Sequence, residues 1–117
     1  MIMTDPASSE QFSQQRAAQN EAVFRDANER IESRLNDLSL EAGRSPFLCE
    51  CPDPACTVIL RLTLTEYEQV REDGRCFVIM PDHGTRDGEV VRKEPTFWVV
   101  RKTGLGGRVA QRTDPRS

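Results

Sequence analysis

Residues 47–56 read Phe-Leu-Cys-Glu-Cys-Pro-Asp-Pro-Ala-Cys, and we expect this stretch to form the centre of the fold. It holds three of the four cysteines, Cys49, Cys51 and Cys56, within eight residues. The one histidine, His83, follows in a Pro-Asp-His-Gly sequence that is typical of a turn. Three thiolates and one imidazole are enough for a tetrahedral zinc site of the Cys3His type. We therefore predict that Cys49, Cys51, Cys56 and His83 are metal ligands.

The spacing within this stretch suits a shared ion. Residues two apart on a strand point to the same side, so Cys49 and Cys51 can present both thiolates together. Pro52 and Pro54 stiffen the turn that returns Cys56 to them. His83 would complete the tetrahedron from the far end of the next buried strand. Four protein ligands leave no open coordination position, which favours a structural zinc over a catalytic one.

Three alternatives to this ligand set stay open. The cysteines can be free thiols in a surface hairpin, with His83 nearby by accident. Cys56 can instead form a redox pair with Cys49 or Cys51, since a Cys-x-Cys disulfide closes a strained ring. Cys76 competes with His83 as the fourth ligand. However, Cys76 opens the apolar run Cys-Phe-Val-Ile-Met, where a buried and inert thiol is the usual case.

A helix is predicted before the cysteine-rich stretch. Residues 1–9 read as a disordered N-terminus, and residues 10–38 lack both Pro and Gly. Apolar residues fall at Val23, Phe24, Ala27, Ile31, Leu35 and Leu38. From Phe24 they recur at steps of three and four along one face, which indicates an amphipathic helix over 10–40.

The remainder reads as a zinc-binding α+β core over 46–103 and a basic flexible tail over 104–117. Strands are expected at 47–51, 57–64, 76–80 and 96–101, with a loop at 82–94. A capping box with Thr65 as N-cap and Glu68 at the third helical position predicts a short helix to Glu72. The predicted fold is thus α+β: a long N-terminal amphipathic helix, then a small antiparallel sheet with one short helix, stabilised by a zinc site.

Composition narrows the classes of function. The chain has 117 residues, of which 37% are hydrophobic, and a formal net charge of −3. That charge does not indicate a nucleic-acid or membrane partner by itself. No apolar run approaches the ~20 residues of a membrane span, and no signal peptide is recognisable. Clustered cysteines without a secretory signal favour metal or redox work in the cytoplasm.

Several segments together resemble a known family. These are Phe47–Cys56, Leu62–Arg71, Pro81-Asp82-His83 and the terminal Thr113–Ser117, with Asn20–Ile31 similar to the family's N-terminal helix. The family is an uncharacterised group of small actinobacterial proteins with a Cys-x-Cys-x4-Cys and a later His at a zinc-binding centre. The resemblance implies the same ligand choice, because the position of Cys76 is not usually Cys in that family. Asp82 stands where the family usually has Gly.

These observations predict a non-enzymatic zinc protein that acts as a protein-interaction or regulatory module. The partner is expected to be another protein, bound through the N-terminal helix. One alternative is a thiol/zinc redox sensor. The other is a nucleic-acid-associated factor, because five bases face one acid in residues 101–117. The bases are Arg101, Lys102, Arg108, Arg112 and Arg116.

Overall fold

In a computed structural model, which describes residues 6–37, 43–84 and 87–116, the chain forms three helices and five strands. In chain order these are α1 (Pro6–Asp37), β1 (Ser45–Leu48), β2 (Ile59–Leu62), α2 (Leu64–Arg71), β3 (Cys76–Ile79), β4 (Gly88–Lys93), β5 (Trp98–Lys102) and α3 (Gly104–Arg112). The strands pair antiparallel in two sheets, β1-β2 and β3-β5-β4. The predicted α+β class with a long N-terminal helix is confirmed, with two small sheets in place of one.

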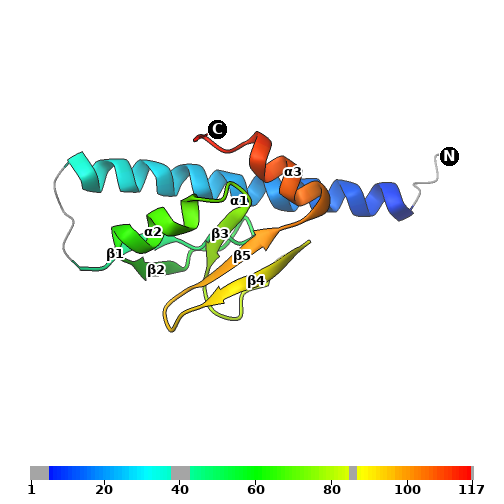
Figure 1. The fold of residues 1–117 in the computed structure, drawn as a ribbon. Helices are drawn as coiled ribbons and strands as arrows, with labels where there is room; N and C mark the ends of the chain where they lie inside the picture. Colours follow the sequence, from blue (N-terminus) through cyan, green and yellow to red (C-terminus); the bar gives the residue numbers. More distant parts are fainter. Residues whose placement is uncertain (1–5, 38–42, 85–86, 117) are drawn as a thin grey trace.

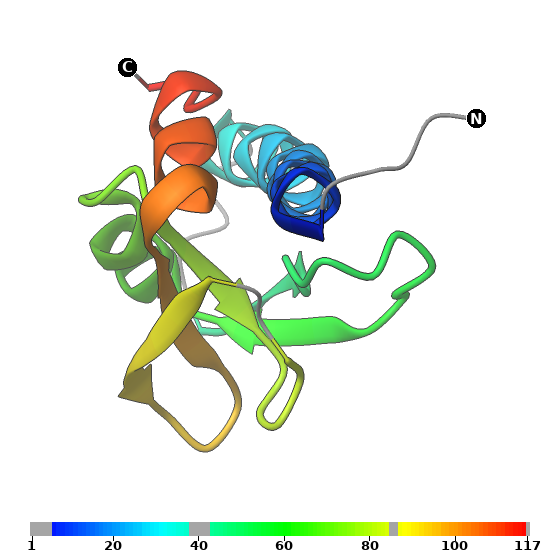
Figure 2. The ribbon, with the colours of Figure 1, turned by 90° about the vertical axis from the view of Figure 1, so that its right-hand side faces the viewer.

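The helices and sheets enclose a single core. α1 runs along one side of both sheets, and α3 packs beside it (Figures 1 and 2). The rings of Phe47 and Tyr67 stack with centroids 4.5 Å apart, which joins β1 to α2. Phe77, Val100 and other fully buried side chains continue this core into the three-stranded sheet. Because the β1-β2 and β3 segments share the core, the ends of β1 and β3 are held close together.

Helix α1 packs on the core through a largely polar face. Its buried polar residues Glu21, Arg25, Asn28 and Glu32 recur at steps of four, three and four, and the other buried side chains that the structure describes on this helix are small: Ala17, Ala18 and Ala22. The predicted apolar face is only partly used, because Ile31 and Leu35 pack against the core whereas Val23 is 66% exposed. Sequence periodicity missed this face because burial of a charged residue requires a partner that only the tertiary structure supplies.

Arg25 shows how such a polar residue is accommodated in the core. Its guanidinium donates to the carbonyl oxygens of Gly74 at 2.6 Å and Ala110 at 2.7 Å. It also lies over the Phe77 ring, 4.5 Å from the centroid. Arg25 therefore connects α1 to the turn before β3 and to α3.

The start of α2 differs from the prediction. The N-cap is Thr63, not Thr65, and the capping box closes with Glu66. The Thr63 hydroxyl accepts from the Glu66 N–H at 3.0 Å, and Glu66 Oε1 accepts from the Thr63 N–H at 2.8 Å. In the sequence, Thr63 with Glu66 and Thr65 with Glu68 both have the Thr-x-x-Glu spacing of a capping box. Thr63 is used because it directly follows β2, which ends at Leu62 with that side chain buried.

Two further expectations need correction. The predicted loop at 82–94 contains β4, which pairs with β5, and the predicted flexible tail at 104–117 contains α3. Glycines suggested disorder there, but Gly107 is buried against the end of β5. A Cβ at Gly107 would lie 2.8 Å from the Lys102 carbonyl oxygen, so the glycine permits close packing.

The limits of α1 also differ from the prediction. The helix begins at Pro6, so the described part of the predicted disordered segment, residues 6–9, is helical. Proline suits the first turn of a helix, where its missing N–H has no partner to lose. The predicted helix end at residue 40 lies outside the described residues.

Candidate metal centre

The structure brings the four predicted ligand residues to one place. Cys49 and Cys51 follow directly after β1, Cys56 lies in the loop that leads to β2, and His83 lies just after β3. Their ligand atoms all lie within 4.8 Å of one another. Cys49 and Cys51 are buried, while Cys56 and His83 are half-buried. We call this group of four side chains the Cys3His cluster.

The distances within the Cys3His cluster fit a tetrahedral ion. Nδ1 of His83 lies 3.4 Å from the sulfur of Cys49 and 3.9 Å from the sulfur of Cys56. Zinc bonds of about 2.3 Å to sulfur and about 2.1 Å to nitrogen place two tetrahedral ligands about 3.6 Å apart. The two observed distances lie on either side of that value. The cluster can therefore hold a metal ion, with Nδ1 as the ligating nitrogen of His83.

Backbone hydrogen bonds shape the loop of residues 49–58, which we call the Cys loop. The Cys49 N–H donates to the Val58 carbonyl oxygen at 3.1 Å and closes the base of this loop. Inside it, Asp53 accepts twice: its carbonyl oxygen from the Cys56 N–H at 3.1 Å, and its side chain from the Ala55 N–H at 2.9 Å. This turn, which the flanking prolines stiffen, returns Cys56 to the other two cysteines.

His83 is presented by a tight turn. The His83 N–H donates to the Met80 carbonyl oxygen at 3.0 Å, across Pro81 and Asp82. Asp82 has φ of +70°, in the left-handed region. Proline followed by a residue with positive φ is the pattern of a type II β-turn. Glycine would suit this position of the turn, since it adopts positive φ without strain.

Two thiols of the Cys3His cluster, those of Cys49 and Cys51, resist ionisation without a cation because their pKa values are raised. Burial raises the pKa of Cys49 far above its ordinary value, although the Met80 N–H, which donates to its sulfur at 3.2 Å, acts in the opposite direction. Burial likewise raises the pKa of Cys51, against a hydrogen bond from the backbone of Asp53. Neighbouring thiolates repel one another as well. A divalent cation would compensate these charges, so metal binding here is coupled to release of the thiol protons.

Glu50 lies between two of the cysteines and is fully buried. Its Oε1 accepts from the Val78 N–H at 3.0 Å, and its own N–H donates to the Val78 carbonyl oxygen at 2.7 Å. Its Oε2 accepts from Nδ2 of Asn28 at 2.7 Å. Burial raises the pKa of Glu50 to about 7, while Asn28 and Val78 lower it. Sequence reasoning missed this residue. The Cys-Glu-Cys pattern was visible in the sequence, but nothing there indicated that Asn28 on α1 would bond to Glu50.

Cys76, the competing fourth ligand, lies elsewhere. Among the residues that the structure describes, the Cys3His cluster is the one group with metal-binding spacing, and Cys76 is outside it. Cys76 is buried at the start of β3, where burial raises its pKa to about 11. All four cysteines are free thiols. The geometry therefore agrees with the choice of His83.

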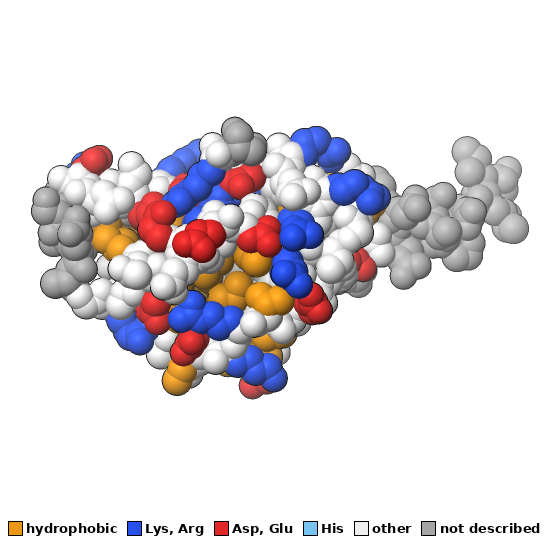
Figure 3. All heavy atoms as spheres, viewed as in Figure 1, with side chains coloured by type: hydrophobic (Ala, Val, Ile, Leu, Met, Phe, Trp, Pro, Cys, Tyr) orange, Lys and Arg blue, Asp and Glu red, His pale blue; other side chains and the backbone are white. Residues whose placement is uncertain are grey.

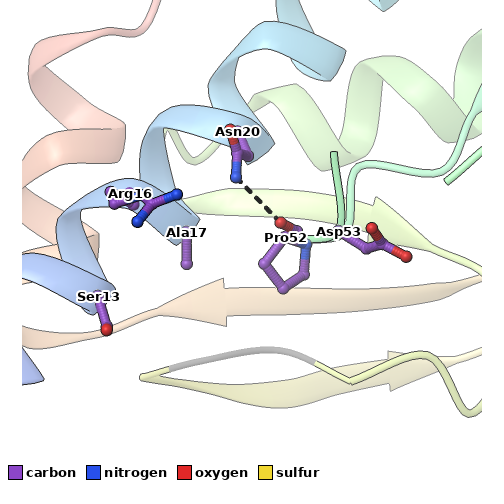
Figure 4. A pocket seen from close by; sticks show the side chains of 6 residues that line it. All are labelled: Ser13, Arg16, Ala17, Asn20, Pro52 and Asp53. Atoms are coloured by element: carbon purple, nitrogen blue, oxygen red, sulfur yellow. Dashed lines mark hydrogen bonds between the residues drawn. The ribbon is translucent and has the colours of Figure 1, made fainter. Parts of the chain in front are cut away.

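A surface pocket of about 330 Å³ borders the Cys loop (Figure 4). In it, Nδ2 of Asn20 on α1 donates to the Pro52 carbonyl oxygen at 3.2 Å. The lining residues are Ser13, Arg16, Ala17, Asn20, Pro52 and Asp53. Helix α1 thus contacts the Cys loop here as well as at Glu50.

The basic residues of the C-terminal segment do not gather into one exposed surface. Lys102 is buried and lies 3.0 Å from Glu21. Arg101 pairs with Glu89 at 2.6 Å. Basic and acidic side chains are intermixed on the face that Figure 3 shows.

Arg116, near the end of the chain, is also neutralised. It pairs with Glu29, Glu32 and Glu68 at 2.8–2.9 Å. Of the five predicted phosphate contacts, Arg108 and Arg112 are exposed on α3 and lack an ion pair to these acids. The Arg-rich segment is therefore mostly engaged within its own fold.

Within the described residues, no helix combines the length and the apolar character needed to cross a membrane. Comparison of the chain with known protein families, curated proteins and solved structures finds no match. The interpretation of this protein therefore rests on the α+β fold and on the Cys3His cluster.

Proposed function

We propose that this chain is a non-enzymatic zinc-binding protein of the cytoplasm, in which a structural zinc ion supports a protein-interaction or regulatory module. The observation that carries the proposal is the Cys3His cluster, whose ligand atoms lie within 4.8 Å of one another. Thiolate sulfur and imidazole nitrogen in a tetrahedral set favour zinc among the common metals. Four protein ligands leave no position for a substrate or an activated water, which supports a structural ion.

The likeness to the small actinobacterial proteins becomes part of this proposal. The turn at Asp82 supports it, since a positive φ of +70° fits the glycine that those proteins usually carry there. The two cysteines and the histidine that follow the ends of β1 and β3 fit the same pattern.

The interaction part of the proposal concerns α1. Figure 1 shows that the N-terminal part of this helix extends past the sheets, while its middle packs on α3 and the strands. Val23 is a large apolar side chain on α1 that is 66% exposed. A helix that is anchored through its polar face and presents an apolar side chain outward can offer that face to a second protein.

Metal content tests the structural-zinc part. The protein purified under reducing conditions should carry one zinc per chain by elemental analysis and native mass spectrometry. Cys51→Ser should lose this zinc, because it removes one of four ligands. Cys76→Ser is the matched control, since the same change outside the Cys3His cluster should leave the zinc content unchanged. Reduced, folded wild-type protein that carries no zinc and takes up none when zinc is supplied would contradict the proposal.

The interaction part has its own test. Val23→Glu changes an exposed residue of α1 and should leave zinc content and unfolding unchanged. Wild-type protein should recover a stoichiometric partner from native lysate, and Val23→Glu should not recover it. Equal recovery by wild type and variant would contradict the assignment of α1 as the contact.

A thiol/zinc redox sensor is a second candidate, which the half-exposure of Cys56 favours. A peroxide would oxidise the Cys56 thiolate to a sulfenic acid and be reduced to water. A neighbouring thiol, Cys49 or Cys51, would then attack that sulfur, form the S–S bond and expel a second water. Loss of two thiolates would release the zinc. Zinc release on mild peroxide treatment, reversed by a reductant, tests this candidate, and retention of zinc would dismiss it.

A further inference from the structure

We propose that Asn28 and Glu50 are positioning residues for the metal centre, and that through them metal binding and the docking of helix α1 stabilise each other. The proposal rests on the proposed zinc site and adds to it a link between that site and a separate element of the fold. The link consists of side-chain hydrogen bonds that join α1, the Cys loop and β3.

Glu50 fixes the backbone between two ligands. Its N–H donates to the Val78 carbonyl oxygen at 2.7 Å, and its Oε1 accepts from the Val78 N–H at 3.0 Å. The Cys loop is therefore joined to the edge of β3 by one backbone bond and one side-chain bond. Cys49 and Cys51 flank Glu50 directly. A shift of the Glu50 backbone would therefore move both sulfurs relative to His83.

Asn28 holds the same segment from the side of α1. Its Oδ1 accepts from the Leu48 N–H at 2.7 Å, and its Nδ2 donates to the Leu48 carbonyl oxygen at 2.9 Å and to Glu50 Oε2 at 2.7 Å. One side chain thus satisfies both backbone polar groups of the residue before Cys49, together with the carboxylate that follows it. Asn28 is fully buried, so water does not replace these bonds while α1 is docked.

The contacts of α1 divide into two sets. On one side, Asn28 bonds to Leu48 at the end of β1 and to Glu50 in the Cys loop, and Asn20 bonds to the Pro52 carbonyl oxygen in the same loop. The two asparagines are eight residues apart, which places them on one side of the helix.

The other set joins α1 to elements that carry no ligand. Arg25 donates to Gly74 and Ala110, and Glu29 pairs with Arg71 and Arg116. A change in the second set should loosen α1 without a direct effect on the ligands. A change in the first set should act on both.

Linkage makes the coupling reciprocal. If a docked α1 raises the affinity of the Cys3His cluster for zinc by some factor, bound zinc favours the docked helix by the same factor. Residues that orient metal ligands through hydrogen bonds commonly change metal affinity by about 10–100-fold when they are removed. We therefore expect Asn28→Ala to weaken zinc binding by about tenfold.

Glu29→Gln provides the matched control. Glu29 is the next residue on α1 and contributes to helix docking through Arg71 and Arg116, but it does not touch the Cys loop. Because Arg25 and Asn28 still hold α1 docked in this variant, its zinc affinity should stay within about twofold of wild type. A merely stabilising role for Asn28 would lower the unfolding midpoint of both variants and leave the zinc affinity of both folded proteins unchanged.

The experiment uses the full chain with zinc ion as the probe. Zinc affinity is measured by competition with a chromogenic chelator under reducing conditions, for wild type, Asn28→Ala and Glu29→Gln. Hydrogen exchange of wild-type α1 is then followed by mass spectrometry with and without zinc. Slower exchange across residues 17–37 in the zinc form, together with weaker zinc binding by Asn28→Ala alone, is the expected result.

The outcomes separate this inference from the proposed zinc site. Wild-type protein that binds no zinc would overturn both. Wild-type protein that binds zinc, with α1 exchange equal in the two forms or with unchanged affinity in folded Asn28→Ala, would overturn the coupling alone. If Asn28→Ala fails to fold, the wild-type exchange comparison decides the question by itself.

Discussion

Nζ of Lys102 lies 3.0 Å from Oε1 of Glu21, and neither side chain is exposed to solvent. Lys102 ends β5 and Glu21 lies on α1, so this ion pair joins the long helix to the three-stranded sheet. A buried ion pair adds little net stability over an apolar pair of similar size. Removal of one partner, however, leaves an uncompensated charge in the core.

We expect Lys102→Met to lower the free energy of unfolding by about 3–5 kcal/mol, measured by urea denaturation of the zinc-loaded protein. The double variant Lys102→Met/Glu21→Met should recover most of that loss, because neither charge then remains buried. If the losses of unfolding free energy in the two single variants simply add in the double variant, the pairing is contradicted.

The turn that presents His83 leads to a second prediction. Asp82 has φ of +70°, which is unfavourable for residues with a side chain by about 1–2 kcal/mol and less so for Asp. Asp82→Gly should therefore raise the free energy of unfolding by about 0.5–1 kcal/mol, and Asp82→Ala should lower it. Thermal unfolding of the zinc-loaded protein measures both. A lower midpoint for the glycine variant would argue against the turn.

Glu32 makes the stability depend on pH. Burial, with a hydrogen bond to Glu68 and the charge of that residue, raises the pKa of Glu32 from 4.5 to about 8, although Arg116 acts in the opposite direction. Between these pH values the folded protein keeps a proton that the unfolded chain has released. The contribution of Glu32 to stability is thus complete below about pH 4.5 and declines as the pH rises through about 8.

Glu32→Gln, which cannot titrate, tests this dependence. In urea denaturation of zinc-free, reduced protein, the variant should gain stability relative to wild type as the pH rises from 5 to about 8. In wild type the hydrogen bonds of Glu68 with Arg116 and then with Glu32 lower the pKa of Glu68 to about 2, so its carboxylate stays ionised over that range. A difference between the two proteins that stays constant over pH 5–8 would refute the shift.

The sequence predicted that the four side chains of the Cys3His cluster lie together, because most of the information for this is local. Three cysteines within eight residues, with prolines between them, define a small loop whatever the rest of the chain does. His83 was the one imidazole available to complete the set. The buried face of α1 was not predictable in this way, because Arg25 and Asn28 are buried only where carbonyl oxygens of distant segments accept their hydrogen bonds.

The same limit applies to α2 and α3. Two Thr-x-x-Glu pairs stand in Leu62–Glu68, and only the end of β2 decides that Thr63 is the one used. Glycine has two opposite meanings in a sequence, since it breaks regular structure and also permits close packing. For Gly107 the second meaning holds, but the Lys102 carbonyl oxygen that decides it belongs to β5 and not to the local pattern.

That close packing leads to the last prediction. A Cβ on Gly107 would lie 2.8 Å from the Lys102 carbonyl oxygen, a backbone atom that cannot rotate away. Gly107→Ala should therefore lower the free energy of unfolding by about 1–3 kcal/mol through overpacking, although alanine is the better helix former. Gln111→Ala, on the exposed side of α3, is the control and should change stability by less than about 0.5 kcal/mol. If α3 were a flexible tail, Gly107→Ala would leave the urea midpoint unchanged or raise it, so the sign of the shift separates a packed helix from a loose one.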